Sequence, residues 1–305
     1  MKLGLLTAAF PGMPLEEIAE WASANNFRTL EIACWPVGKA ARRYAGVTTI
    51  NVDDFTKEKS EEIRKLLKSK KLDISALAYY PNPLHPDSEH RNVVINHLKK
   101  VIDASSLLMD DPIVGTFIGK DKTKTVEENI EKFSIIWPDI VKYAKNRGVK
   151  IAIENCPMIF SSDEWPGGLN LANSPANLRK LFEIIPDDCF GLNFDPSHLV
   201  WQMIDINRFI KEFNKRIFHV HAKDMEIDSD GLYGNGITSL GMGWQLPRLP
   251  GLGCIDWSKL ISQLYHVGYD HVISIEHEDR MFEGTEELVK RGFLLARDTL
   301  QPFIH

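Results

Sequence analysis

The segment FHVHAKDME, residues 218–226, is typical of a buried strand that ends in polar side chains. The two-residue repeat of a strand places His219 and His221 on the same side, and Lys223 and Asp224 follow at its end. A strand that only fills a core has no need of two imidazoles and a charge pair. The segment therefore predicts a strand whose carboxyl end reaches a functional site.

Similar apolar runs, rich in β-branched residues, recur along the chain without a regular polar alternation, as is typical of strands covered on both faces. The predicted strands are residues 2–10, 29–35, 73–80, 112–119, 150–155, 189–195, 216–222 and 271–277. The helical patterns between them include residues 14–26, 56–71, 125–148, 174–185 and 255–268. Strands that alternate with helices predict parallel βαβ units.

Eight such units predict a (β/α)8 TIM barrel, an α/β fold, in a single domain over residues 1–305. The alternative is a doubly wound sheet, but FPGMP after the first strand lacks the glycine-rich phosphate turn of that fold. A glycine-rich stretch at about 225–255 follows the seventh strand. We expect it to form a long irregular loop that acts as a lid or a binding loop.

Composition argues against several classes of protein. The 305 residues are 44% hydrophobic and 26% charged, which is ordinary for a globular protein. The net charge of −6 and the lack of a basic run argue against a nucleic-acid partner. No apolar run approaches the length of a membrane span, and MKLGLLTAAF reads as a first strand rather than a signal peptide. The four cysteines are widely spaced, so we expect a cytoplasmic protein.

The last four predicted strands all end in groups that bind metals or protons: Glu154-Asn155, Asp195-Pro196-Ser197-His198, His219-Val220-His221 and Glu276-His277-Glu278. The carboxyl ends of barrel strands meet at one rim, where unpaired charges would be costly. A divalent cation bound by three carboxylates and one imidazole would remove that cost. Such ligands favour Mn²⁺ or Mg²⁺, with Co²⁺ and Zn²⁺ as alternatives. For any single residue, a salt bridge at the rim is the competing interpretation.

Four motifs in this order, IAIEN (151–155), NFDPSH (193–198), HVHAKD (219–224) and ISIEHED (273–279), resemble the xylose-isomerase-like superfamily of sugar isomerases and epimerases. The resemblance spans essentially the whole chain and implies a homo-oligomer. It also implies that the metal ligands are Glu154, Asp195, His221 and Glu276, that Glu154 and Glu276 are the catalytic acid/base pair, and that His198 contacts the substrate.

Epimerases of this superfamily often have an arginine a few residues after the metal-binding histidine, and this chain has none there. We expect Lys223 or Arg248 to bind the substrate in its place. Trp35 comes just after the second predicted strand, where its ring can form a sugar platform. These residues suit a small-molecule sugar or keto-sugar.

The predicted reaction is proton abstraction next to a carbonyl, with the metal as a Lewis acid and two glutamates as base and acid. A metal-dependent lyase that cleaves 3-keto-glycosides by β-elimination is an alternative, because it begins with the same proton abstraction. An endonuclease-like phosphodiesterase is disfavoured by the net charge of −6. A sugar-binding barrel without catalysis would leave the metal ligands without a purpose.

Overall fold

The computed structural model of the chain describes residues 1–38, 45–159, 168–237 and 243–305. Eight parallel strands close into a barrel in the order β1-β2-β3-β4-β5-β6-β7-β10, with β10 pairing with β1. They are β1 (Lys2–Leu6), β2 (Thr29–Ala33), β3 (Asp73–Ala78), β4 (Ile113–Thr116), β5 (Lys150–Glu154), β6 (Phe190–Phe194), β7 (Ile217–Ala222) and β10 (Val272–Ile275). Each predicted strand is present, although β1 and β4 have only about half of their predicted length, and the predicted TIM barrel is confirmed.

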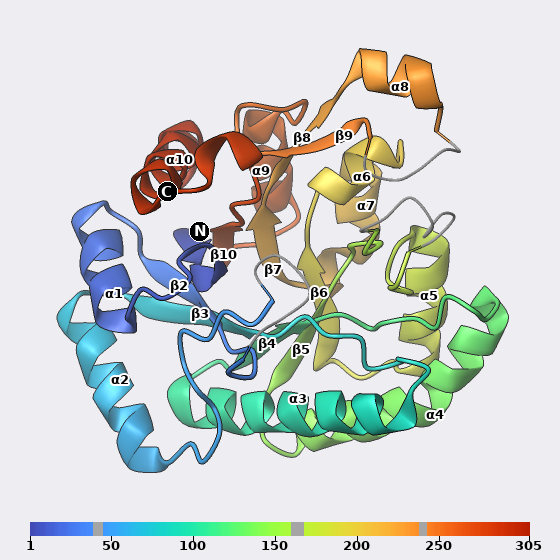
Figure 1. The fold of residues 1–305 in the computed structure, drawn as a ribbon, viewed down its shortest axis with the longest axis horizontal. Helices are drawn as coiled ribbons and strands as arrows, with labels where there is room; N and C mark the ends of the chain where they lie inside the picture. Colours follow the sequence, from blue (N-terminus) through green and yellow to red (C-terminus); the bar gives the residue numbers. More distant parts are fainter. Residues whose placement is uncertain (39–44, 160–167, 238–242) are drawn as a thin grey trace.

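Helices surround the barrel and cover the outer faces of its strands (Figure 1). They are α1 (Leu15–Ala24), α2 (Lys57–Ser69), α3 (Ser88–Leu108), α4 (Val126–Lys145), α5 (Pro175–Ile184), α7 (Ile206–Phe213), α9 (Trp257–His266) and α10 (Glu286–Leu300). A short helix, α6 (Ser197–Trp201), follows β6 directly. Short 3-10 turns lie at 7–9, 214–216, 280–282 and 301–303.

Local sequence signals account for where several helices begin. Thr125 caps α4 by accepting a hydrogen bond from the backbone of Glu128, whose side chain bonds back to Thr125 in a capping box. Ser174 and Asp256 cap α5 and α9, and each accepts a hydrogen bond from the backbone N–H group three residues later. Pro138 lies inside α4 but does not divide it. The apolar face around Phe133 and Trp137 is fully buried, and this packing outweighs the hydrogen bond that the proline removes.

The stretch 225–255 is more ordered than the glycine content suggests, and the expectation of an irregular loop is wrong for its described part. It forms an antiparallel hairpin from β8 (Asp224–Ile227) and β9 (Gln245–Arg248), with α8 (Ser229–Asn235) between them. Residues 238–242 lie outside the described ranges. The hairpin follows β7 directly, and α8 projects away from the barrel (Figure 1).

The hairpin is fixed to the barrel by a buried carboxylate at its first residue. Asp224 accepts hydrogen bonds from the backbone of Ile255 at 3.0 Å and Gly251 at 3.1 Å, and from Nε1 of Trp257 at 2.9 Å. These bonds tie β8 to the segment that leads into α9. The side chain of Asp224 therefore holds the hairpin in place.

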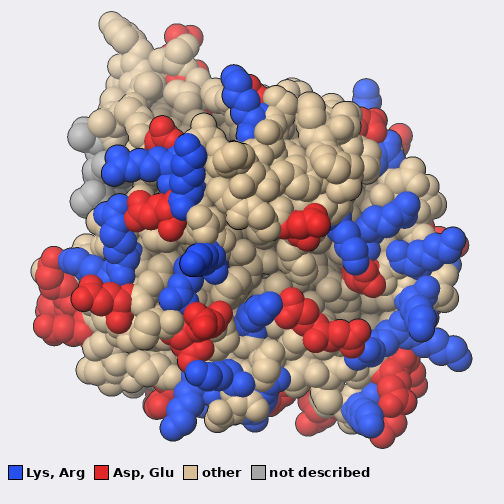
Figure 2. Space-filling model, turned by 180° about the vertical axis from the view of Figure 1, so that it is seen from behind, with Lys and Arg blue, Asp and Glu red and all other residues tan. Residues whose placement is uncertain are grey.

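Two further observations bear on possible partners. No helix in the described part of the chain is long and apolar enough to cross a membrane. On the face seen in Figure 2, basic and acidic side chains are interspersed over the surface.

Candidate active site

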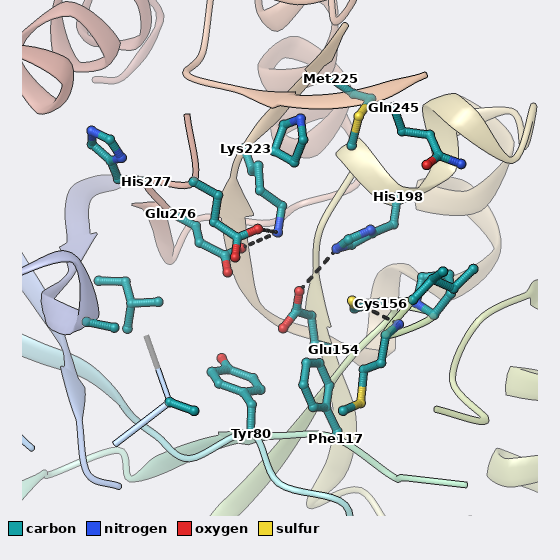
Figure 3. Close-up of a pocket in the computed structure, with 18 of the residues that line it drawn as sticks. Tyr80, Phe117, Glu154, Cys156, His198, Lys223, Met225, Gln245, Glu276 and His277 are labelled. Atoms are coloured by element: carbon teal, nitrogen blue, oxygen red, sulfur yellow. Dashed lines mark hydrogen bonds and ion pairs between the residues drawn. The ribbon is translucent and has the colours of Figure 1, made fainter. Parts of the chain in front are cut away.

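A cavity of about 350 Å³ opens at the carboxyl ends of the barrel strands. Its polar wall includes Glu154 at the end of β5, His198 on α6, Lys223 after β7 and Glu276 after β10 (Figure 3). The volume suits a small organic ligand. The strand-end positions of these side chains follow from the barrel itself, because every parallel strand delivers its last residues to the same rim.

The four residues expected to bind a metal lie together. Glu154, Asp195, His221 and Glu276 each offer one ligand atom, and these atoms all lie within 4.8 Å of one another. Nδ1 of His221 is 3.0 Å from Oε2 of Glu276 and 3.9 Å from Oε1 of Glu154. Residues in or just after four different strands thus converge on one point, although the first and the last of them are more than a hundred positions apart in the sequence.

Lys223 lines the same cavity, but its ammonium group is bound by carboxylates. Its side chain is only 2% exposed, and Nζ lies 2.9 Å from Asp195, 2.8 Å from Glu276 and 3.1 Å from Glu278. Burial alone would lower the pKa of Lys223, but these carboxylates raise it well above its ordinary value. Lys223 is therefore buried among carboxylates and does not lie at an open rim, while its contact with a substrate oxygen stays a prediction.

The donor set fits a divalent cation. Three carboxylates, those of Asp195, Glu276 and Glu278, contact the Lys223 ammonium, and a fourth, that of Glu154, lies 3.9 Å from His221. Oδ2 of Asp195 and Nδ1 of His221 are buried and make no well-aligned hydrogen bond to any described residue. Burial acts against protonation of His221, but its acidic neighbours raise its pKa well above the ordinary value. A bound cation would replace the proton on Nδ1 of His221, because a histidine must be neutral to bind a metal.

The buried carboxylate of Glu31 orients the imidazole ring of His221. Glu31 of β2 is fully buried, and its Oε2 lies 2.8 Å from Nε2 of His221 and accepts from Ser274 at 3.0 Å. Its Oε1 accepts from the hydroxyl of Tyr80 at 2.7 Å. Burial raises the pKa of Glu31, but His221 and His219 lower it to about 2. Glu31 is therefore ionised and accepts a hydrogen bond from the Nε2–H group of His221, which leaves Nδ1 facing the carboxylates.

His219 occupies a different environment from His221, as its deeper place in the strand predicts. It is fully buried, with Nδ1 at 3.0 Å from Oδ1 of Asn193 and Nε2 at 3.1 Å from Oγ of Ser75. Burial is the largest influence on His219 and lowers its pKa to about 3. A neutral imidazole with one donor and one acceptor satisfies both neighbours, so His219 is a core residue.

Of the other residues predicted to contact substrate, His198 and Trp35 line the cavity and Arg248 does not. His198 lies over the carboxylates, with Nε2 at 3.2 Å from Asp195 and 3.5 Å from Glu154. Trp35 lines the cavity beside Tyr80, with ring centroids 6.0 Å apart. Arg248 does not belong to the described lining of the cavity.

Arg248 is directed away by the pleat of the hairpin. Gln245 and Pro247 face the cavity, so Leu246 and Arg248 point to the opposite side of β9. There Nε of Arg248 lies 2.8 Å from Oδ2 of Asp279, and its NH1 group contacts Glu226. The side chain of Arg248 therefore links the hairpin to the segment after β10, and it is not placed in the cavity as the prediction that it binds substrate requires.

Other lining residues were not predicted. They include Phe117, Trp201, Met225 and Gln245. Phe117 follows β4, so the rule that strand ends carry the site could have found it. Met225 and Gln245 lie on the hairpin, and the glycine-rich sequence gave no indication that a hairpin forms there.

Comparisons with known proteins agree with this architecture. An uncharacterized protein of Bacillus subtilis strain 168, YfiH, is 28% identical over 313 residues, which cover 92% of this chain and 93% of that protein. Among the solved structures that share the fold are two with a TM-score of 0.71. One is an IOLI protein with a bound zinc atom, with a TM-score of 0.71, 18% identity and coverage of 100% of this chain and 99% of that one.

The other solved structure is D-psicose 3-epimerase with D-tagatose, from Clostridium cellulolyticum H10. It has a TM-score of 0.71 and 16% identity, with full coverage of both chains. A family model described as Xylose isomerase-like TIM barrel matches residues 19–298, nearly the whole chain. The chain therefore belongs to the xylose isomerase-like TIM barrel family.

Proposed function

We propose that the protein is a divalent-metal-dependent sugar isomerase or epimerase that moves a proton at a carbon next to a carbonyl group. The observation that carries the proposal is the convergence of Glu154, Asp195, His221 and Glu276 within 4.8 Å at the floor of the cavity. The epimerase and the zinc-binding protein with the same fold support it.

Glu154, Asp195, His221 and Glu276 would hold the cation, which when bound supplies a Lewis acid for a carbonyl or hydroxyl oxygen of the sugar. Oxygen ligands predominate in this set, so Mn²⁺ is the metal that we expect. The zinc atom of the related fold makes Zn²⁺ the first alternative.

The two glutamates supply the proton chemistry. Glu154 lies at the end of β5 and Glu276 just after β10, so their carboxylates approach the cavity from different strands. Burial raises the pKa of Glu154, but hydrogen bonds from His198 and His221 lower it, so this carboxylate is ionised and suited to accept a proton. One carboxylate removes the proton and the other returns it: return to the opposite face gives an epimer, and return at the neighbouring carbon gives an isomer.

The walls of the cavity suit a sugar. Trp35, Tyr80 and Phe117 form an aromatic side, with Tyr80 and Phe117 at 5.1 Å between ring centroids. Aromatic rings are good platforms for the apolar faces of sugar rings. His198 lines the cavity next to Glu154 and Asp195, where its imidazole would bind a substrate oxygen.

The test is solvent exchange. Protein loaded with Mn²⁺ is incubated in D₂O with free ketohexoses, sugar phosphates and 3-keto-glycosides, and the products are followed by NMR. We expect deuterium at a carbon next to the carbonyl of at least one free ketose, and loss of that exchange in Glu154→Gln and in Glu276→Gln. Glu212→Gln, which changes a surface glutamate bonded to Arg179, is the matched control and should behave as wild type.

The outcomes separate the alternatives. Exchange that survives in both active-site variants would refute the two-glutamate mechanism. Cleavage of a 3-keto-glycoside without any turnover of ketoses would refute the isomerase or epimerase and support the lyase. No exchange with any of these substrates would refute the proposal.

A further inference from the structure

The amide of Gln245 lies in the cavity without a hydrogen-bond partner among the described residues. The amide of Gln245 is only 5% exposed, and neither Oε1 nor Nε2 makes a hydrogen bond to any described residue. Most buried amides in proteins are hydrogen-bonded, because removing them from water without compensation is costly. Gln245 also lines the cavity (Figure 3). We therefore expect the amide of Gln245 to form hydrogen bonds with a ligand that binds in the cavity.

The position of Gln245 is built into the hairpin. It is the first residue of β9 and pairs with Ile227 of β8, while Pro247 on the same face of β9 pairs with Met225. Pro247 and Met225 also line the cavity, so one face of the hairpin forms part of its wall. Asp224 at one strand and Arg248 at the other anchor the hairpin through buried or half-buried contacts. The amide is therefore held on a rigid element.

We propose that Gln245 is a substrate-recognition residue that hydrogen-bonds an uncharged hydroxyl group of the sugar; the inference rests on the proposed function and names the substrate class more closely. A hydroxyl donates to Oε1 and accepts from Nε2, so one or two neighbouring hydroxyls satisfy both atoms. A phosphate or carboxylate offers only acceptors and would leave Oε1 facing a negative charge. The end of the substrate at the hairpin is therefore a neutral polyol.

The surroundings of Gln245 sharpen this assignment. Trp201 and Met225 line the cavity with it, and neither carries a charge: the indole of Trp201 offers one N–H donor and the thioether of Met225 a weak acceptor. The cationic Lys223 is bound by three carboxylates, so it does not compensate an anionic substituent there. Figure 3 shows Gln245 near Met225 and on the other side of His198 from Glu154. A substrate that reaches both Gln245 and the carboxylates spans the cavity.

The first test is the stability of ligand-free protein. Gln245→Met keeps the volume and removes an amide that has no partner, so its melting temperature should rise by about 2–4 °C. The matched control is Gln202→Met. Nε2 of Gln202 donates to the backbone oxygen of His198 at 2.7 Å, so this variant should lower the melting temperature.

The second test is substrate recognition. With the best neutral ketose found by the exchange assay, Gln245→Met should lower kcat/KM about 10- to 100-fold, mainly through KM, because a hydroxyl loses its partner. Mono-deoxy analogues of that ketose are then compared. For the analogue that lacks the contacted hydroxyl, wild type and Gln245→Met should have equal kcat/KM.

A lower melting temperature of Gln245→Met would show that the amide has an internal role and would overturn the inference. An unchanged KM for every ketose that wild type turns over would also overturn it, as would a preference of wild type for sugar phosphates that Gln245→Met abolishes. Failure of the proposed function would appear separately, as a lack of turnover by wild type. In that case the melting temperature of Gln245→Met alone decides the inference.

Discussion

Oε2 of Glu31 lies 2.8 Å from Nε2 of His221, and both side chains are fully buried below the cavity. The contact joins β2 to β7, which lie on different sides of the barrel. It fixes which imidazole nitrogen carries the proton, and it directs Nδ1 toward Glu276 and Glu154. A carboxylate behind a histidine ligand orients the ring and increases its basicity.

Glu31→Gln should therefore weaken the binding of Mn²⁺ by about 10- to 100-fold, the usual effect of losing such a partner. Isothermal titration calorimetry measures the affinity directly. Tyr80→Phe removes the hydrogen bond to Oε1 of Glu31 but keeps the contact between Glu31 and His221, so it should weaken Mn²⁺ binding less than Glu31→Gln does. Equal affinities in Glu31→Gln and wild type would show that His221 does not depend on Glu31.

Lys223 is expected to stabilise the protein in the absence of metal and to compete with the metal. Its ammonium binds Asp195 and Glu276, two of the residues proposed as ligands. Lys223→Met should destabilise metal-free protein by about 3–5 kcal/mol, because buried carboxylates lose their counter-charge. The variant should bind Mn²⁺ more tightly than wild type. Urea denaturation with and without metal checks both parts, and weaker metal binding by the variant would contradict the competition.

Arg248 should act on stability, because it links the hairpin to Asp279. Arg248→Ala removes the partner of a buried carboxylate and should lower the free energy of unfolding by about 1–3 kcal/mol. Arg248→Lys should not restore it, since one ammonium cannot match the two contacts that the guanidinium makes with Asp279 and Glu226. A variant with wild-type stability and a raised KM would instead restore the prediction that Arg248 binds substrate.

The barrel and the meeting of the four acidic and imidazole groups could be predicted because both follow from local rules. Alternation of strands and helices predicts the closed sheet, and strand ends then bring Glu154, Asp195, His221 and Glu276 to one rim. The relation between His219 and His221 also follows from strand geometry, since residues two apart point the same way at different depths.

The remaining features depend on pairings between distant segments. The direction of Arg248 is set by the register of β8 with β9, and a glycine-rich sequence gives no clue to that register. The ion pairs of Lys223 include one to Glu278, which lies beyond the end of β10. Gln245 had no signal of its own, because an isolated glutamine in a predicted loop resembles any surface residue.

The two histidines of FHVHAKDME give the most direct test of the central claim, which is that Glu154, Asp195, His221 and Glu276 hold a divalent cation. The measurement is the metal content of purified protein after incubation with Mn²⁺ and removal of the excess, by inductively coupled plasma mass spectrometry. Wild type and His219→Ala, which is expected to lose mainly stability, should retain one Mn²⁺ per folded chain, and His221→Ala should retain essentially none. Equal metal content in His221→Ala and wild type, or no metal in wild type, would contradict the account.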